Sequence, residues 1–135
     1  MVKRISDIEG IGVKTSEVLK AAKVNTVEDL LEVAGSKKGR AQLSKETGMS
    51  ESVLLKCANM ADLFRIKGVA SQYAELLERS GVDTVKELKH RNAENLVTKM
   101  NEINASKKLV RKTPSVAVVT GWIEQAKDLP AKISH

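Results

Sequence analysis

Hydrophobic positions recur at the three- and four-residue spacing of α-helices along most of this 135-residue chain. In the first half of the chain this spacing predicts helices over residues 13–22, 27–33, 41–45 and 53–63. The alternation of apolar and polar residues that is typical of β-strands is weak throughout. The pattern therefore predicts an all-α fold.

Short polar residues stand where several of these helices should begin. Thr26 and Thr84 each precede acidic residues, an arrangement that caps the amides of a first helical turn. Ser50 and Ser115 stand in front of the last long apolar run of each half, and Gly81 follows a helical run as a stop signal. We therefore expect short helices with their own caps.

The apolar pattern occurs twice along the chain. A shift of 58 residues lays residues 8–30 on residues 66–88 and keeps most positions apolar or polar. The register then slips by about seven residues, after which residues 50–61 match residues 115–126. The repeat predicts a tandem fold.

We expect two units, residues 1–63 and residues 64–135, each with four to five short helices. The second unit is longer, and its extra residues are expected between Asn92 and Thr113. This stretch includes a basic loop.

Each unit begins with a glycine-containing turn. Gly10 and Gly12 flank Ile11 in the first unit, whereas the second keeps Gly68 and has Ala70 in place of the other glycine. Two glycines permit backbone angles that allow a sharp turn between helices, and the apolar residue between them is expected to anchor the turn in the core.

The backbone amides after the first turn should lie at the start of a helix, which is an anion-binding geometry. Lys14 adds a cation beside them. Such an arrangement contacts phosphate and not base edges, so we expect binding that is independent of sequence and weakens with salt.

Residues 8–15, together with residues 24–30, resemble the helix-hairpin-helix domains that occur in pairs in recombinases, ligases and repair nucleases. The whole chain also resembles a small prokaryotic family of unassigned function with two such units. The resemblance implies two SAM-like helix-hairpin-helix units and no particular activity. The residues that match the hairpin motif are Gly10, Ile11, Gly12, Lys14 and Thr15.

The second unit departs from this motif. Besides Ala70, it has Gln72 at the position of Lys14. We therefore expect hairpin contact with phosphate in the first unit, and we expect the second unit to carry its charge on the basic loop.

The net charge of +6 favours an acidic partner, and a DNA or RNA phosphate backbone is the expected one. Clusters of cations precede the last helix of each unit. The predicted nucleic-acid contacts are Gly10, Ile11, Gly12, Lys14, Thr15, Lys37, Lys38, Arg40, Gly68, Lys107, Lys108, Arg111 and Lys112.

A second function stays open, because the same turn mediates protein contacts in many such domains. The chain could be a protein-interaction or assembly module with a protein partner and no nucleic-acid role, or an accessory piece of an enzyme system encoded elsewhere, and the sequence does not separate these two. The choice between DNA and RNA also stays open, although an aromatic share of 2% provides few rings for stacking bases.

Residue types that carry catalysis are sparse. Cys57, His90 and His135 are the only cysteine and histidines of the chain, and their spacing fits no metal site. Cys57 and Trp122 occupy corresponding positions in the last helices and are expected in the core. We therefore expect no enzyme, no cofactor and no small-molecule substrate.

The single cysteine excludes an internal disulfide and fits a reducing compartment. No apolar run approaches the roughly 20 residues that span a bilayer, and the first residues become charged too early for a signal peptide. We expect a cytoplasmic protein without a membrane partner.

Overall fold

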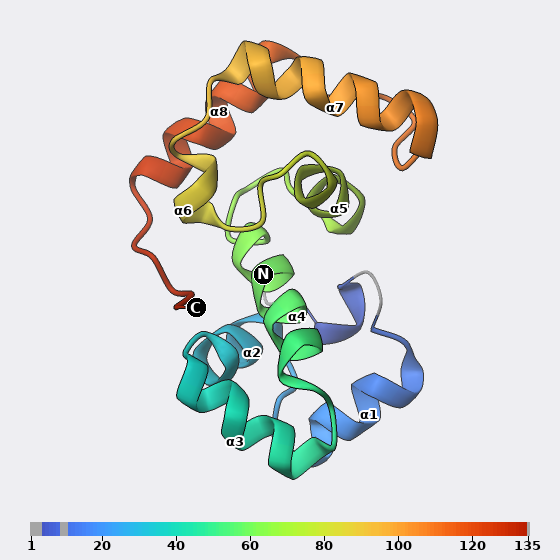
Figure 1. Ribbon diagram of the computed structural model, residues 1–135, viewed down its shortest axis with the longest axis vertical. Helices are drawn as coiled ribbons and strands as arrows, with labels where there is room; N and C mark the ends of the chain where they lie inside the picture. The colour runs from blue at the N-terminus through green and yellow to red at the C-terminus, as the bar shows by residue number, and fades with distance from the viewer. Residues whose placement is uncertain (1–3, 9–10, 135) are drawn as a thin grey trace. The chain divides into compact units, whose positions relative to one another are not determined.

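The computed structural model describes residues 4–8 and 11–134, and these residues form short helices joined by tight turns (Figure 1). The helices are η1 (Ile5–Asp7, a 3-10 helix), α1 (Val13–Ala21), α2 (Val27–Ala34), α3 (Lys37–Thr47), α4 (Glu51–Leu63), α5 (Ser71–Arg79), α6 (Val85–Leu88), α7 (Ala93–Lys107) and α8 (Val116–Lys127). Within these ranges, extended pairing is limited to one isolated bridge between Arg4 and Thr26. The predicted all-α fold is confirmed.

The chain divides into two compact units, with the boundary between Asp62 and Leu63. The first unit contains η1 and α1 to α4, and the second contains α5 to α8. The prediction that residues 132–135 belong to the second unit is wrong, because the chain from Lys132 onward groups with the first. There the Ser134 amide donates a hydrogen bond of 2.8 Å to the Gly35 carbonyl.

The two units use the same backbone hydrogen bonds around their first long helix. The matching amide-to-carbonyl pairs, all between 2.8 and 3.1 Å, are Ile11 to Ile8 and Val69 to Ile66, Ser16 to Gly12 and Ala74 to Ala70, and Val24 to Leu19 and Val82 to Leu77. Residues 58 positions apart therefore occupy equivalent places on the backbone.

Hydroxyl side chains start four of the helices, as predicted. The amide-to-hydroxyl bonds, all 3.0 to 3.2 Å, run from Asp29 to Thr26, from Glu87 to Thr84, from Val53 to Ser50 and from Val118 to Ser115. Such a bond satisfies an amide that the helix itself leaves unpaired. Local sequence therefore sets where these helices begin.

Each unit closes around aliphatic side chains. Ile11 and Val69 are buried at the turn before α1 and α5, so both anchor their turns as expected. Cys57 and Trp122 are buried at corresponding positions in α4 and α8, as predicted.

The units differ in length after this shared part. α6 has four residues where α2 has eight, whereas α7 has fifteen where α3 has eleven. A segment of six residues, 109–114, then separates the C-cap of α7 from the N-cap of α8. The extra residues of the second unit therefore lie in α7 and in this segment. Among the helices that the structure describes, none combines the length and apolar character of a membrane span.

Candidate nucleic-acid interface

The first turn of α1 is open to solvent in the first unit. Val13 is 77% exposed, Lys14 is exposed, and Thr15 is half-buried. No side chain caps this helix at Gly12, so the amides of the first turn are left for an outside acceptor. Gly10 lies outside the described residues.

Of the two turn glycines Gly12 and Gly68, only Gly68 needs to be glycine. Gly12 has φ −84° and ψ −175°, Ala70 has nearly the same angles, and nothing lies within 4 Å of a Cβ built on Gly12. Gly68 instead has φ +96°, and a Cβ there would lie 3.1 Å from Nε1 of Trp122. The expectation that the turn needs a second glycine is therefore wrong, and Ala70 does not weaken it.

The first basic cluster lies on a helix and not in a loop. Ser36 caps α3 by accepting a hydrogen bond of 3.0 Å from the Gly39 amide, so Lys37 and Lys38 form the exposed first turn. Two cations stand at the positive end of the helix dipole. The helix begins earlier than the predicted residue 41 because of this cap.

Arg40 does not belong to the surface. Its side chain is only 4% exposed, and Nη1 donates to the carbonyls of Ala34 and Gly35 at 3.0 and 3.1 Å. Nη2 donates to the carbonyl of Ser134. Arg40 therefore satisfies the end of α2 and holds the C-terminal segment, and its prediction as a phosphate contact is wrong.

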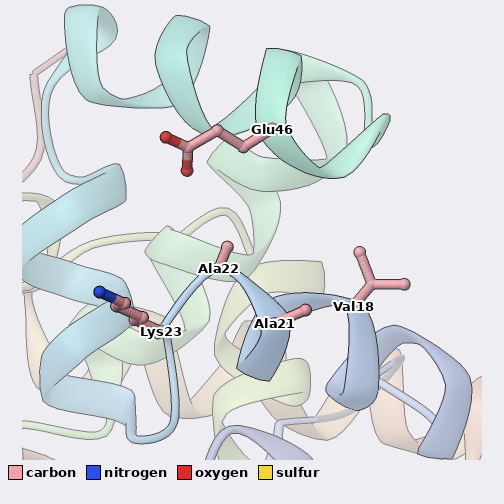
Figure 2. A pocket seen from close by; sticks show the side chains of 5 residues that line it. All are labelled: Val18, Ala21, Ala22, Lys23 and Glu46. Atoms are coloured by element: carbon pink, nitrogen blue, oxygen red, sulfur yellow. The ribbon is translucent and has the colours of Figure 1, made fainter.

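The cations predicted in the first unit do not lie together on one surface. The second half of α1 shares a hollow with Glu46 near the end of α3, and Glu46 and Lys23 both line it (Figure 2). Lys37 precedes Glu46 by nine residues, roughly 14 Å of helix. The first turns of α1 and α3 thus lie at far ends of the first unit (Figure 1).

In the second unit, the predicted cations lie close together near the start of α5. Residues 107–112, here called the basic segment, contain Lys107, Lys108, Arg111 and Lys112, all exposed. A surface hollow of about 530 Å³ is lined by Gln72 of α5, Asn104 of α7, and Lys108, Leu109, Val110 and Arg111 of the basic segment. Among the described residues, this lining includes two cations and no carboxylate.

Asn104 fixes the basic segment. Its Nδ2 donates to the Val110 carbonyl, and its Oδ1 accepts from the Val110 amide, both at 3.0 Å. Lys108 caps α7 with a left-handed backbone, φ 52°, which turns the chain toward this contact. The basic segment is therefore fixed near its beginning by the turn at Lys108 and in its middle by the contact of Asn104 with Val110.

Two further contacts hold the start of α5 in place. The Tyr73 hydroxyl donates to the Lys112 carbonyl at 3.1 Å, and the Tyr73 ring packs 5.5 Å from that of Trp122. The Gln125 side chain bonds both backbone polar atoms of Lys67, at 2.9 and 3.2 Å. Sequence reasoning missed Asn104 and Gln125, because amide side chains give no signal until their partners are known. It did single out Gln72, but only as a departure from the hairpin motif at the position of Lys14.

Other chemistry is limited in the described part of the chain. Burial raises the pKa of the Cys57 thiol to about 11, against a smaller lowering by Lys56, so Cys57 is a poor nucleophile at neutral pH. No group of three or more metal-ligating side chains occurs among the described residues.

A family model described as a domain of unknown function, DUF4332, matches residues 9–129. No curated protein and no solved structure matches the chain. The family description names no activity, so the chemistry of the hollow must carry any proposal about function.

Proposed function

We propose that this chain, which belongs to the DUF4332 family of domains of unknown function, binds the phosphate backbone of nucleic acid independently of base sequence. DNA is the proposed ligand. One observation carries the proposal. Lys108 and Arg111 line a single hollow together with Gln72 in the first turn of α5, and no carboxylate is among the described residues that line it.

Phosphate oxygens accept hydrogen bonds and carry negative charge, so they favour cations beside N–H donors. Arg111 and Lys108 supply the cations, and the Gln72 side chain supplies a neutral donor. Ala70, the N-cap residue of α5, provides no side-chain cap, so the positive end of the helix dipole adds to the same field. Lys107 and Lys112 extend the charge along the basic segment.

The helix-hairpin-helix resemblance favours the same function. Buried Ile11 and Val69 anchor the two turns, and the exposed residues after each turn begin a helix. That combination is what a phosphate-contacting hairpin requires. In the first unit, Lys14 at α1 and Lys37 and Lys38 at α3 would add separate, weaker contacts.

Readout of bases has little support in the described surface. Trp122 and Phe64 are buried, and Tyr73 is occupied by Trp122 and Lys112. Proteins that hold single strands by stacking use exposed rings. Backbone contact is therefore the better match.

The proposal is tested by fluorescence anisotropy with a labelled DNA duplex at two salt concentrations. The double variant Lys108→Glu, Arg111→Glu should lower affinity by at least about tenfold. A matched control, Lys45→Glu with Lys99→Glu, changes the net charge equally at exposed positions of α3 and α7. Absence of salt-sensitive binding by the unaltered chain, or equal losses in both double variants, would contradict the proposal.

Asn104→Ala tests the geometry without changing charge. Loss of both bonds to Val110 should release the basic segment and weaken DNA binding severalfold, while Val110 amide hydrogen exchange becomes faster. Asn101→Ala, at an exposed position of the same helix, is the control and should change neither quantity. Faster exchange with unchanged affinity would show that DNA does not use the held segment.

A protein-interaction role is the alternative, and one observation favours it. Val116 and Val118, in the first turn of α8, are 41% and 46% exposed. Purification after nuclease treatment distinguishes the two functions: a protein that stays bound to the unaltered chain and is lost from Val116→Ser, Val118→Ser would favour the alternative.

A further inference from the structure

The corner between α2 and α3 holds the C-terminal segment, residues 132–134, by its backbone (Figure 1). The Ser134 amide donates to the Gly35 carbonyl at 2.8 Å, and Nη2 of Arg40 donates to the Ser134 carbonyl. The Ser134 side chain forms no hydrogen bond with the other described residues. Gly35 and Arg40 therefore form a site, here called the peptide site, that binds a peptide backbone and not a particular side chain.

The peptide site is built on a buried charge. Arg40 is 4% exposed, and its Nη1 donates to the carbonyls of Ala34 and Gly35 within the first unit. Among the described residues, the Ser134 carbonyl is the acceptor for Nη2. A buried guanidinium donor without an acceptor is costly. The peptide site therefore favours a bound peptide carbonyl.

The repeat does not require the residues of this site. The counterparts of Gly35 and Arg40 in the second unit are Ala93 and Thr98 at a shift of 58 residues, and Met100 and Ala105 at a shift of 65 residues. Neither register places an arginine there. The buried arginine of the first unit is therefore linked to the C-terminal segment and not to the fold that the two units share.

Few bonds hold the stretch of chain that leads to this segment. The chain passes from the second unit into the first between Ala131 and Lys132. The last hydrogen bond back to α8 is that of the Leu129 amide with the Ala126 carbonyl, at 3.2 Å. Residues 130–133 form no hydrogen bond with the other described residues. The C-terminal segment can therefore be redirected without the loss of a bond in the stretch before it.

We propose that the peptide site also accepts the C-terminal segment of a second copy of this chain, so that two copies exchange these segments. The bonds of Ser134 with Gly35 and Arg40 are the same in both arrangements, so exchange sacrifices no contact. The chain's own segment competes at an effective concentration that is roughly millimolar for a short linker. Exchange is therefore expected in concentrated protein, or where the chain's own segment cannot bind.

The site is tested by fluorescence anisotropy with a labelled peptide of residues 128–135 and the full chain carrying Ser134→Pro. Proline removes the amide that binds Gly35, so this chain leaves its own peptide site open. The labelled peptide should bind it saturably, and at least about tenfold more tightly than it binds the unaltered chain. Circular dichroism of the Ser134→Pro chain should match that of the unaltered chain, because residue 134 lies outside every helix.

Two variant peptides provide a matched comparison at one position. The Ser134→Ala peptide should bind as tightly as the native peptide, because the site contacts only the backbone of this residue. The Ser134→Pro peptide should bind at least about tenfold more weakly. Absence of saturable binding, or equal affinity for all three peptides, would overturn the peptide site.

Analytical ultracentrifugation of full chains tests the second copy as the source of the segment. The unaltered chain and Ser134→Ala should form dimers as the concentration rises from about 10 µM to about 1 mM, whereas Ser134→Pro should stay monomeric. Monomers in every case, or dimers in all three chains, would overturn exchange.

These measurements are independent of nucleic-acid binding. The samples are treated with nuclease, and Lys108→Glu with Arg111→Glu should dimerise like the unaltered chain. A loss of dimers in that variant would assign the dimer contact to the basic segment and would contradict exchange. Failure of exchange would leave the proposed binding of DNA untouched, since that binding is measured separately.

Discussion

Lys23 and Gly81 hold the same place in the two units, and both have left-handed backbones, with φ of 66° and 95°. Each follows its first long helix and donates its amide to that helix, Lys23 to Lys20 at 2.9 Å and Gly81 to Glu78 at 3.0 Å. A residue with a side chain pays roughly 1 kcal/mol or more for this conformation, whereas glycine adopts it freely. At this position the first unit therefore carries a backbone strain that the second avoids.

Lys23→Gly should raise the free energy of unfolding of the chain by about 0.5–1 kcal/mol, because it removes this strain. Gly81→Ala should lower it by about 1–2 kcal/mol, since a Cβ there would also lie 3.3 Å from Nη2 of Arg91. Urea denaturation followed by circular dichroism measures both. A destabilised Lys23→Gly variant would contradict the assignment of strain.

The turn glycines should respond differently to a methyl group. Gly12→Ala should be neutral or stabilising by up to about 1 kcal/mol, because its backbone suits any residue and nothing crowds a Cβ. Gly68→Ala should destabilise by about 1–3 kcal/mol, because of its φ of +96° and the nearby Trp122 indole. Thermal melts of both variants decide the matter, and equal effects would show that the two positions have not been distinguished correctly.

Arg40→Ala should lower the free energy of unfolding by about 3 kcal/mol, because buried carbonyls lose charged donors. Lys38→Ala, an exposed neighbour in the same helical turn, should change stability by no more than about 0.5 kcal/mol. Chemical denaturation compares them. Were Arg40→Ala to keep full stability and lose DNA affinity, Arg40 would belong to the binding surface after all.

Cys57 should make stability fall at alkaline pH. Its pKa is raised by burial from 9.0 to about 11 in the folded chain, so its stabilising contribution is complete below pH 9 and disappears as the pH rises toward 11. At pH 10 the loss is about 1.4 kcal/mol. The difference in unfolding free energy between the unaltered chain and Cys57→Ala, measured at pH 8 and pH 10, should narrow by that amount. If the difference in unfolding free energy were the same at both pH values, burial would not suppress ionisation of the Cys57 thiol.

Much of the fold follows from short-range patterns. Thr26, Thr84, Ser50 and Ser115 cap helices where the sequence predicts, because a cap acts within three residues of itself. The start of α3 was placed too late, since the lysines after Ser36 lack the apolar spacing that marks a helix, although the Ser36 cap is present. The terminal segment was assigned to the wrong unit because its partners, Gly35 and Arg40, lie far away in the chain.

The same distinction applies to the candidate interface, where some features follow from the sequence and others depend on tertiary contacts. The cations of residues 107–112 can be identified from composition alone, but their place beside α5 depends on the contact of Tyr73 with Lys112, 39 residues apart. The exclusion of Arg40 depends on burial, which charge patterns do not report.

Helix positions, caps and the duplication were thus encoded locally, since amide spacing and side-chain reach act over a few residues. Packing decided which glycine must be glycine, which arginine is buried and which cations share a surface. Those outcomes depend on backbone angles and neighbours brought together from distant parts of the chain. Gly12 and Gly68 both belong to the turns that the sequence predicts, and only the fold gives one of them a left-handed backbone next to an indole ring.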